Sequence, residues 1–166
     1  MGSGCDREAL PGRRAALRPR HARPRWSGLS AYVDSSALVA ALGREVDSDD
    51  VRATLAAIGP ASTSRLTFVE VHAALASARR GRRISVGALA RARSEFDELW
   101  RSFFVLDVDA SMAVAAADVA DRFALRSHDA VQLASALALQ DPDVTMVALD
   151  KRLLRAAADA GLSVAP

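Results

Sequence analysis

Short apolar segments alternate with longer amphipathic segments along most of the chain. Residues 144–149 form the clearest apolar, β-branched run, and residues 29–34, 61–64 and 103–106 are shorter candidate strands. Apolar residues spaced three and four apart predict helices between these strands, with 162–164 as a candidate edge strand. The predicted helices are 35–42, 47–58, 67–80, 86–100, 110–124, 128–139 and 151–160. Strands that alternate with helices and lack polar alternation indicate an α/β domain around a buried parallel sheet.

The charge is unevenly distributed between the first residues and the rest. The chain has 166 residues and a formal net charge of +2, yet residues 1–30 hold seven of its 22 basic and two of its 20 acidic residues. The first 30 residues therefore carry +5 and the other 136 carry −3. Residues 1–28 are rich in Arg, Pro and Gly and lack apolar periodicity, which predicts a disordered basic extension before a domain spanning 29–166. A nucleic-acid-binding arm, an upstream extension from a wrong start codon and an organelle transit segment all stay open.

Cysteine content and hydropathy point to a compartment. Cys5 is the single cysteine, so no intramolecular disulfide can form, and a reducing cytoplasm is the simplest prediction. No apolar run of the length of a secretory signal core follows the early charges. No stretch of 18 apolar residues is present either, so we predict no membrane span.

Four carboxylates stand where predicted strands give way to helices. Asp34 ends the first strand and Asp150 follows the strand at 144–149, while Glu70 and Asp129 fall in the first turns of predicted helices. In an open parallel sheet, sites form beyond the carboxyl ends of the strands. If the sheet is parallel, these four side chains converge on one edge although they are far apart in sequence.

Each acid also has a structural explanation. Thr67 and Glu70 fit the spacing of a capping box, Asp129 suits the positive end of a helix dipole, and Asp150 is a plausible N-cap. Asp34 is the hardest to explain in this way, because a carboxylate that ends an apolar strand is costly when it is buried without a partner.

A cluster of four carboxylates favours a bound metal. Neighbouring carboxylates repel one another and their pKa values rise, and a divalent cation removes that repulsion. A ligand set made only of oxygen favours Mg²⁺ or Mn²⁺ over zinc, and His72 and His128 are not spaced like a zinc motif. Such a site is suited to phosphodiester chemistry.

Four segments surround the four acids: Tyr32–Leu38, Ser64–Val71, Leu125–Ala136 and Val147–Leu153. Together they resemble one known family, the PIN-domain nucleases, and within it the VapC-type toxins of bacterial toxin–antitoxin pairs. The third is the most specific, and the fourth departs from many members, which have Thr or Ser where Ala148 or Leu149 stands. The order and spacing agree over about residues 29–166. The resemblance implies a three-layer α/β/α fold with a short central parallel sheet.

The resemblance also implies an activity and a site. Asp34, Glu70, Asp129 and Asp150 would form the catalytic site of an Mg²⁺- or Mn²⁺-dependent endoribonuclease. Asp34 and Asp129 are expected to bind the metal directly, and Asp150 directly or through water. Glu70 would bind a second metal or orient the attacking water, and the hydroxyl of Ser36 would hold a carboxylate or a metal water. For His128 we expect a packing role.

Partners follow from the same resemblance: a cognate antitoxin, an RNA substrate and a second copy of the chain in a homodimer. The basic run Arg79, Arg80, Arg82 and Arg83 is a candidate rim for RNA phosphates, although a solvated helix end explains it equally well. Two other functions stay open. One is a non-catalytic RNA-binding module, and the other is an aspartyl phosphatase, which would usually need a second Asp where Ser36 stands.

Overall fold

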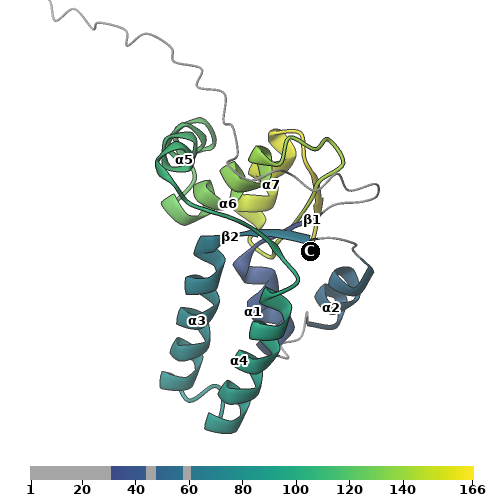
Figure 1. The fold of residues 1–166 in the computed structure, drawn as a ribbon, viewed down its shortest axis with the longest axis vertical. Helices are drawn as coiled ribbons and strands as arrows, with labels where there is room; N and C mark the ends of the chain where they lie inside the picture. Colours follow the sequence, from purple (N-terminus) through teal and green to yellow (C-terminus); the bar gives the residue numbers. More distant parts are fainter. Residues whose placement is uncertain (1–30, 44–47, 58–60) are drawn as a thin grey trace, which may run out of the picture.

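The computed structural model describes residues 31–43, 48–57 and 61–166, and these form five strands and seven helices (Figure 1). The strands are β1 Ala31–Val33, β2 Ala61–Ser64, β3 Phe104–Leu106, β4 Thr145–Val147 and β5 Ser163–Ala165. The helices are α1 Ser35–Gly43, α2 Ser48–Ala57, α3 Arg65–Arg80, α4 Val86–Trp100, α5 Ala110–Phe123, α6 Ser127–Ala138 and α7 Lys151–Asp159. The predicted extension at 1–28 lies outside the described residues.

All five strands run parallel in the order β3-β2-β1-β4-β5. The chain moves outward from β1 to β3 on one side and then crosses to β4 and β5 on the other. The order therefore reverses beside β1, which makes the β1/β4 boundary a topological switch point. The backbone N–H of Asp34 donates to the carbonyl of Val147 at 2.9 Å, which extends this pair by one more bond. The carboxyl ends of β1 and β4 therefore meet at one place.

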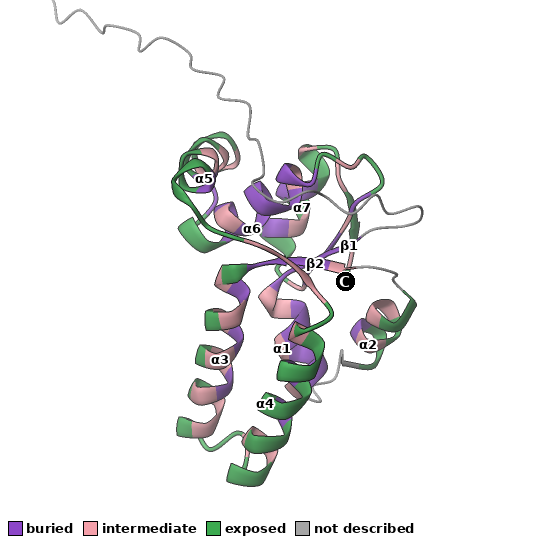
Figure 2. Cartoon of the chain, in the orientation of Figure 1, coloured by how far each residue is buried: buried purple, intermediate pink, exposed green. Residues whose placement is uncertain are grey.

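Helices cover both faces of the sheet, α1 to α4 on one and α5 to α7 on the other (Figure 1). Alternating side chains of the strands divide the core between these layers. Tyr32 and Met146 pack with α5, α6 and α7, whereas Ala31, Val33 and Val147 pack with α1 to α4. The burial pattern agrees, since α6 is mostly buried and α4 is mostly exposed (Figure 2). The predicted three-layer α/β/α fold is confirmed.

The predicted element boundaries hold to within three residues for the described part of the chain, with one informative difference. The predicted helix at 67–80 begins at Arg65 instead. Ser64 is its N-cap, because its hydroxyl accepts from the backbone N–H of Leu66 at 3.2 Å. The strand at 144–149 narrows to Thr145–Val147. Among the described residues, no helix combines the length and the apolar character needed to cross a membrane.

Candidate active site

Asp34 lies at the switch point, immediately after β1. It is 4% exposed, and one of its oxygens, Oδ2, accepts from the backbone N–H and the hydroxyl of Ser36 at 2.9 and 2.5 Å. The hydroxyl of Ser36 in turn accepts from the backbone N–H of Leu149 at 2.9 Å. Ser36 therefore ties the carboxylate after β1 to the loop after β4.

Burial controls the ionisation of Asp34. Desolvation raises the pKa of Asp34 above its ordinary value, the hydrogen bonds from Ser36 lower it, and the negative charge of Glu70 raises it further. Glu70 therefore lies close enough to Asp34 to repel it. Two acids from different elements share one electrostatic environment at this edge.

Glu70 belongs to the second turn of α3 and not to the first, so the capping-box prediction is wrong. Ser64 already caps the helix, and the hydroxyl of Thr67 lies 2.9 Å from that of Thr63 inside the core. The Oε2 atom of Glu70 instead accepts from the Nε2 of Gln132 at 2.6 Å. Glu70 is half-buried and contacts α6, while Ser64 caps the start of α3.

Asp129 occupies the first turn of α6, as predicted, and is 6% exposed. The Nε2 of His128 lies 3.3 Å from its Oδ1, which forms an ion pair when the imidazole is protonated. The packing role predicted for His128 is wrong, because 49% of its side chain is exposed. Its position at the start of α6 places it on the surface beside the acid.

Asp150 is the N-cap of α7, which confirms the structural explanation of this residue. Its Oδ1 accepts from the backbone N–H groups of Arg152 and Leu153 at 2.8 and 3.1 Å. Both bonds fall on one oxygen, and the side chain is exposed three residues after β4. Capping is therefore compatible with a second role for the other oxygen.

The oxygen donors at this edge fit a hard divalent cation. Asp34 is buried beside a second negative charge, and a cation would relieve both its desolvation and its repulsion from Glu70. These side chains suit such a cation by their oxygen atoms and by their position at this edge of the sheet. Across the described ranges, no three His, Cys, Asp or Glu side chains lie close enough together to form a ready-made metal shell.

A buried polar network under these acids was not identified from the sequence. Gln132, 1% exposed on α6, accepts from the hydroxyl of Tyr32 at 2.6 Å and donates to Glu70 and Thr67. The available signal was a polar residue three positions after Asp129, within an otherwise apolar helical run. This spacing places the two residues on one helix face.

The basic run lies away from the acids. Arg79 and Arg80 stand in the last turn of α3, roughly 13 Å along the helix from Glu70 at 1.5 Å per residue. This position confirms that they complement the helix dipole. Arg82 and Arg83 follow in the exposed turn before α4.

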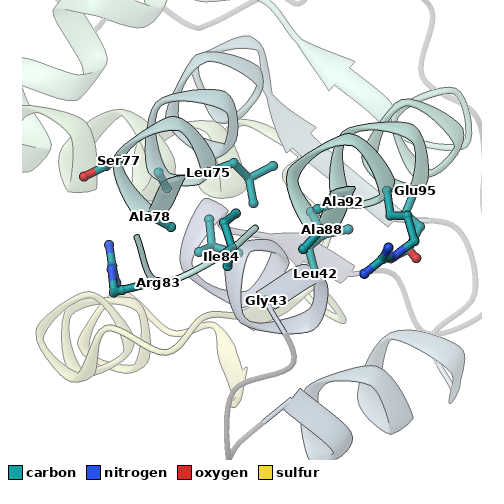
Figure 3. Close-up of a pocket in the computed structure, with 13 residues that line it drawn as sticks. Leu42, Gly43, Leu75, Ser77, Ala78, Arg83, Ile84, Ala88, Ala92 and Glu95 are labelled. Carbon is teal, nitrogen blue, oxygen red and sulfur yellow. The ribbon is translucent and has the colours of Figure 1, made fainter. Parts of the chain in front are cut away.

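A cavity of about 450 Å³ opens beside this basic run, between α1, α3 and α4 (Figure 3). Leu42, Leu75 and Ile84 supply apolar lining, and Arg83 and Glu95 supply charge. None of the four acids singled out above lines it.

Strand order, three-layer packing and acids at the switch point together define a family. Residues 31–159 match the PIN domain, and the chain belongs to the PIN-domain family. It is 38% identical over 135 residues to Ribonuclease VapC45 of Mycobacterium tuberculosis, covering 81% of this chain and 94% of that protein.

Solved structures agree on the fold. A toxin–antitoxin complex from Klebsiella pneumoniae matches with a TM-score of 0.58 at 17% identity, over 82% of this chain and 96% of that one. VapC20 of M. tuberculosis, described as a sarcin–ricin loop cleaving toxin, matches with a TM-score of 0.61 at 20% identity, over 80% and 95%.

Proposed function

We propose that this protein is a divalent-metal-dependent endoribonuclease that acts as the toxin of a toxin–antitoxin pair. The observation that carries the proposal is the buried Asp34 at the β1/β4 switch point, close enough to Glu70 for their charges to repel, in a chain of the PIN-domain family. The 38% identity to a protein named as a VapC ribonuclease supports RNA as the substrate.

The four acids take separate roles in this proposal. Asp34 and Asp129, both buried, hold the metal directly, and Mg²⁺ or Mn²⁺ suits their oxygen donors. Asp150 binds directly or through water with the oxygen that does not cap α7. Glu70 orients the attacking water or contributes to a second metal. Ser36 keeps Asp34 facing the site.

A bound divalent cation would supply charge neutralisation at the phosphodiester and a water of lowered pKa. The protein holds the carboxylate oxygens in fixed positions. The Ser36 hydroxyl holds Oδ2 of Asp34, so its other oxygen is the one available to the site. Glu70 is held at Oε2 by Gln132, which leaves Oε1 for hydrogen bonding to water. Hydrolysis adds the water oxygen to phosphorus and breaks one P–O bond of the RNA.

Partners form part of the same proposal. The K. pneumoniae toxin–antitoxin complex shares this fold, which supports an antitoxin as a partner of this chain. A homodimer is proposed on the resemblance alone. The run Arg79–Arg83 would contact RNA phosphates well away from the scissile bond, given its distance from Glu70 along α3.

The direct test is RNA cleavage by purified wild-type protein and by the variants Asp34→Asn and Asp129→Asn. We expect cleavage that needs Mg²⁺ or Mn²⁺, stops in EDTA, and falls by at least about a hundredfold in each variant. Circular dichroism should show an unchanged fold. Cleavage that survives both EDTA and the two substitutions would contradict the proposal. RNA binding without any cleavage would favour the non-catalytic module.

A further inference from the structure

A chain of buried hydrogen bonds lies between the elements that carry the acids. The Oε1 of Gln132 accepts from the hydroxyl of Tyr32 at 2.6 Å. Its Nε2 donates to Oε2 of Glu70 at 2.6 Å and to the hydroxyl of Thr67 at 3.0 Å. Gln132 therefore joins β1, α3 and α6 three residues after Asp129.

The chain continues through two threonines toward β1. The hydroxyl of Thr63 donates to the carbonyl oxygen of Val33 at 2.7 Å. It also lies 2.9 Å from the hydroxyl of Thr67, which in turn lies 3.3 Å from Oε1 of Gln132. Thr67 also accepts from the amide N–H of Gln132. The network thus ends on the carbonyl of the residue immediately before Asp34.

The orientation of the Gln132 amide is fixed at its other end as well. Tyr32 is fully buried, and its hydroxyl lies 2.6 Å from Oε1 of Gln132. An amide oxygen only accepts, so the phenol donates in this contact. The amide N–H groups of Gln132 are its only donors, and Nε2 lies 2.6 Å from Oε2 of Glu70, so Nε2 faces Glu70. A turned amide would place two oxygens 2.6 Å apart, so one orientation alone satisfies both contacts.

We propose that Gln132 is the positioning residue for Glu70. Its amide holds one oxygen of Glu70 and so sets the direction in which the other faces the cation site at Asp34 and Asp129. The inference rests on the proposed function, because it gives Glu70 a place in the catalytic site. Gln132 needs no contact with RNA or metal. It acts through Glu70, as partners of ligating side chains do in metal enzymes.

The test compares substitutions at Gln132 with a substitution of equal structural severity elsewhere. Gln132→Met keeps the volume and removes the hydrogen bonds to Tyr32, Thr67 and Glu70, and Gln132→Glu keeps the shape and removes the N–H donors. Val144→Ala is the matched control, because Val144 is fully buried against the same helical layer at the amino end of β4. Each variant is measured for kcat and KM on RNA, for its melting temperature, and for Mn²⁺ affinity by calorimetry with Mn²⁺ alone.

We expect both Gln132 variants to lower kcat by about 10- to 100-fold and to weaken Mn²⁺ binding by about tenfold, with KM within about threefold. Val144→Ala should lower the melting temperature and leave kcat and Mn²⁺ affinity unchanged. Gln132 variants that match Val144→Ala in kcat and Mn²⁺ affinity would overturn the inference. If the wild type binds Mn²⁺ and cuts no RNA, the proposed function fails, and the Mn²⁺ affinities alone decide the role of Gln132. A wild type that binds no Mn²⁺ overturns both.

Discussion

The carboxyl edge of β1 and β4 and the cavity between α1, α3 and α4 differ in almost every respect. The edge brings Asp34, Glu70 and Gln132 together from three segments; Asp34 and Gln132 are buried, and all three side chains are hydrogen-bonded. The cavity is lined mainly by apolar side chains and small alanines, with Arg83, Arg91 and Glu95 among them (Figure 3). This cavity thus lies away from the acids.

This difference shows that the cavity and the acidic side chains lie in separate parts of this fold. Parallel strands bring their carboxyl ends to one edge, which fixes where the charges meet regardless of any cavity. The cavity lies beside the turn that joins α3 and α4, where short side chains such as Ala74 and Ala88 line it. A buried carboxylate whose pKa is raised by burial and a neighbouring charge is therefore the better guide to the site.

The largest expected effect is on RNA cleavage, which should fall on substitution at the acidic edge and change little on substitution at the cavity. Asp150→Ser keeps a good N-cap, so the free energy of unfolding should change by less than about 0.5 kcal/mol, while loss of the carboxylate lowers kcat by about 10- to 100-fold. Ala88→Leu places a larger side chain toward the cavity and should leave kcat within about threefold. Steady-state kinetics and urea denaturation of both variants measure this contrast.

Either of two results would contradict this contrast between the acidic edge and the cavity. If Asp150→Ser cleaves RNA like the wild type, then Asp150 serves α7 as a cap and has no part in the site. If Ala88→Leu abolishes cleavage at unchanged stability, the cavity belongs to the catalytic machinery.

A smaller effect concerns stability and pH in metal-free protein. Burial and the charge of Glu70 raise the pKa of Asp34 above its ordinary value of 3.8, so the folded state holds this proton more tightly than the unfolded state. The free energy of unfolding should therefore fall as pH rises from 3.8 through the folded-state pKa. Asp34→Asn removes this penalty, and its stability relative to the wild type should grow between about pH 4 and pH 7.

Urea denaturation in EDTA across that pH range measures the effect. Identical pH dependence in the two proteins would mean that Asp34 is solvated or paired in solution, which contradicts a buried, charge-repelled carboxylate at the edge.

Much of the fold could be predicted from the chain because its signals are local. Apolar runs, helical spacing and glycines such as Gly81 located the described elements to within three residues. The N-cap at Asp150 also follows from local sequence. The start of α3 did not, because both Ser64 and Thr67 are good caps, and tertiary contacts decided between them. Thr67 is taken by Thr63 and Gln132 in the core.

The acids could be proposed from the sequence, and their surroundings could not. Strand ends place Asp34 and Asp150, and the starts of predicted helices place Glu70 and Asp129. The contact between Glu70 and Gln132 joins residues 62 positions apart, and no local pattern encodes it. The exposure of His128 likewise depends on how α6 meets the rest of the molecule.

The most direct measurement is an anomalous difference map from a crystal of the wild-type protein soaked in Mn²⁺. We predict a peak in contact with the carboxylates of Asp34 and Asp129, beyond the carboxyl ends of β1 and β4, that is absent from a crystal of Asp129→Asn. A map with no peak at that edge under saturating Mn²⁺, or a peak held equally by Asp129→Asn, would contradict the assignment of these acids as the metal site.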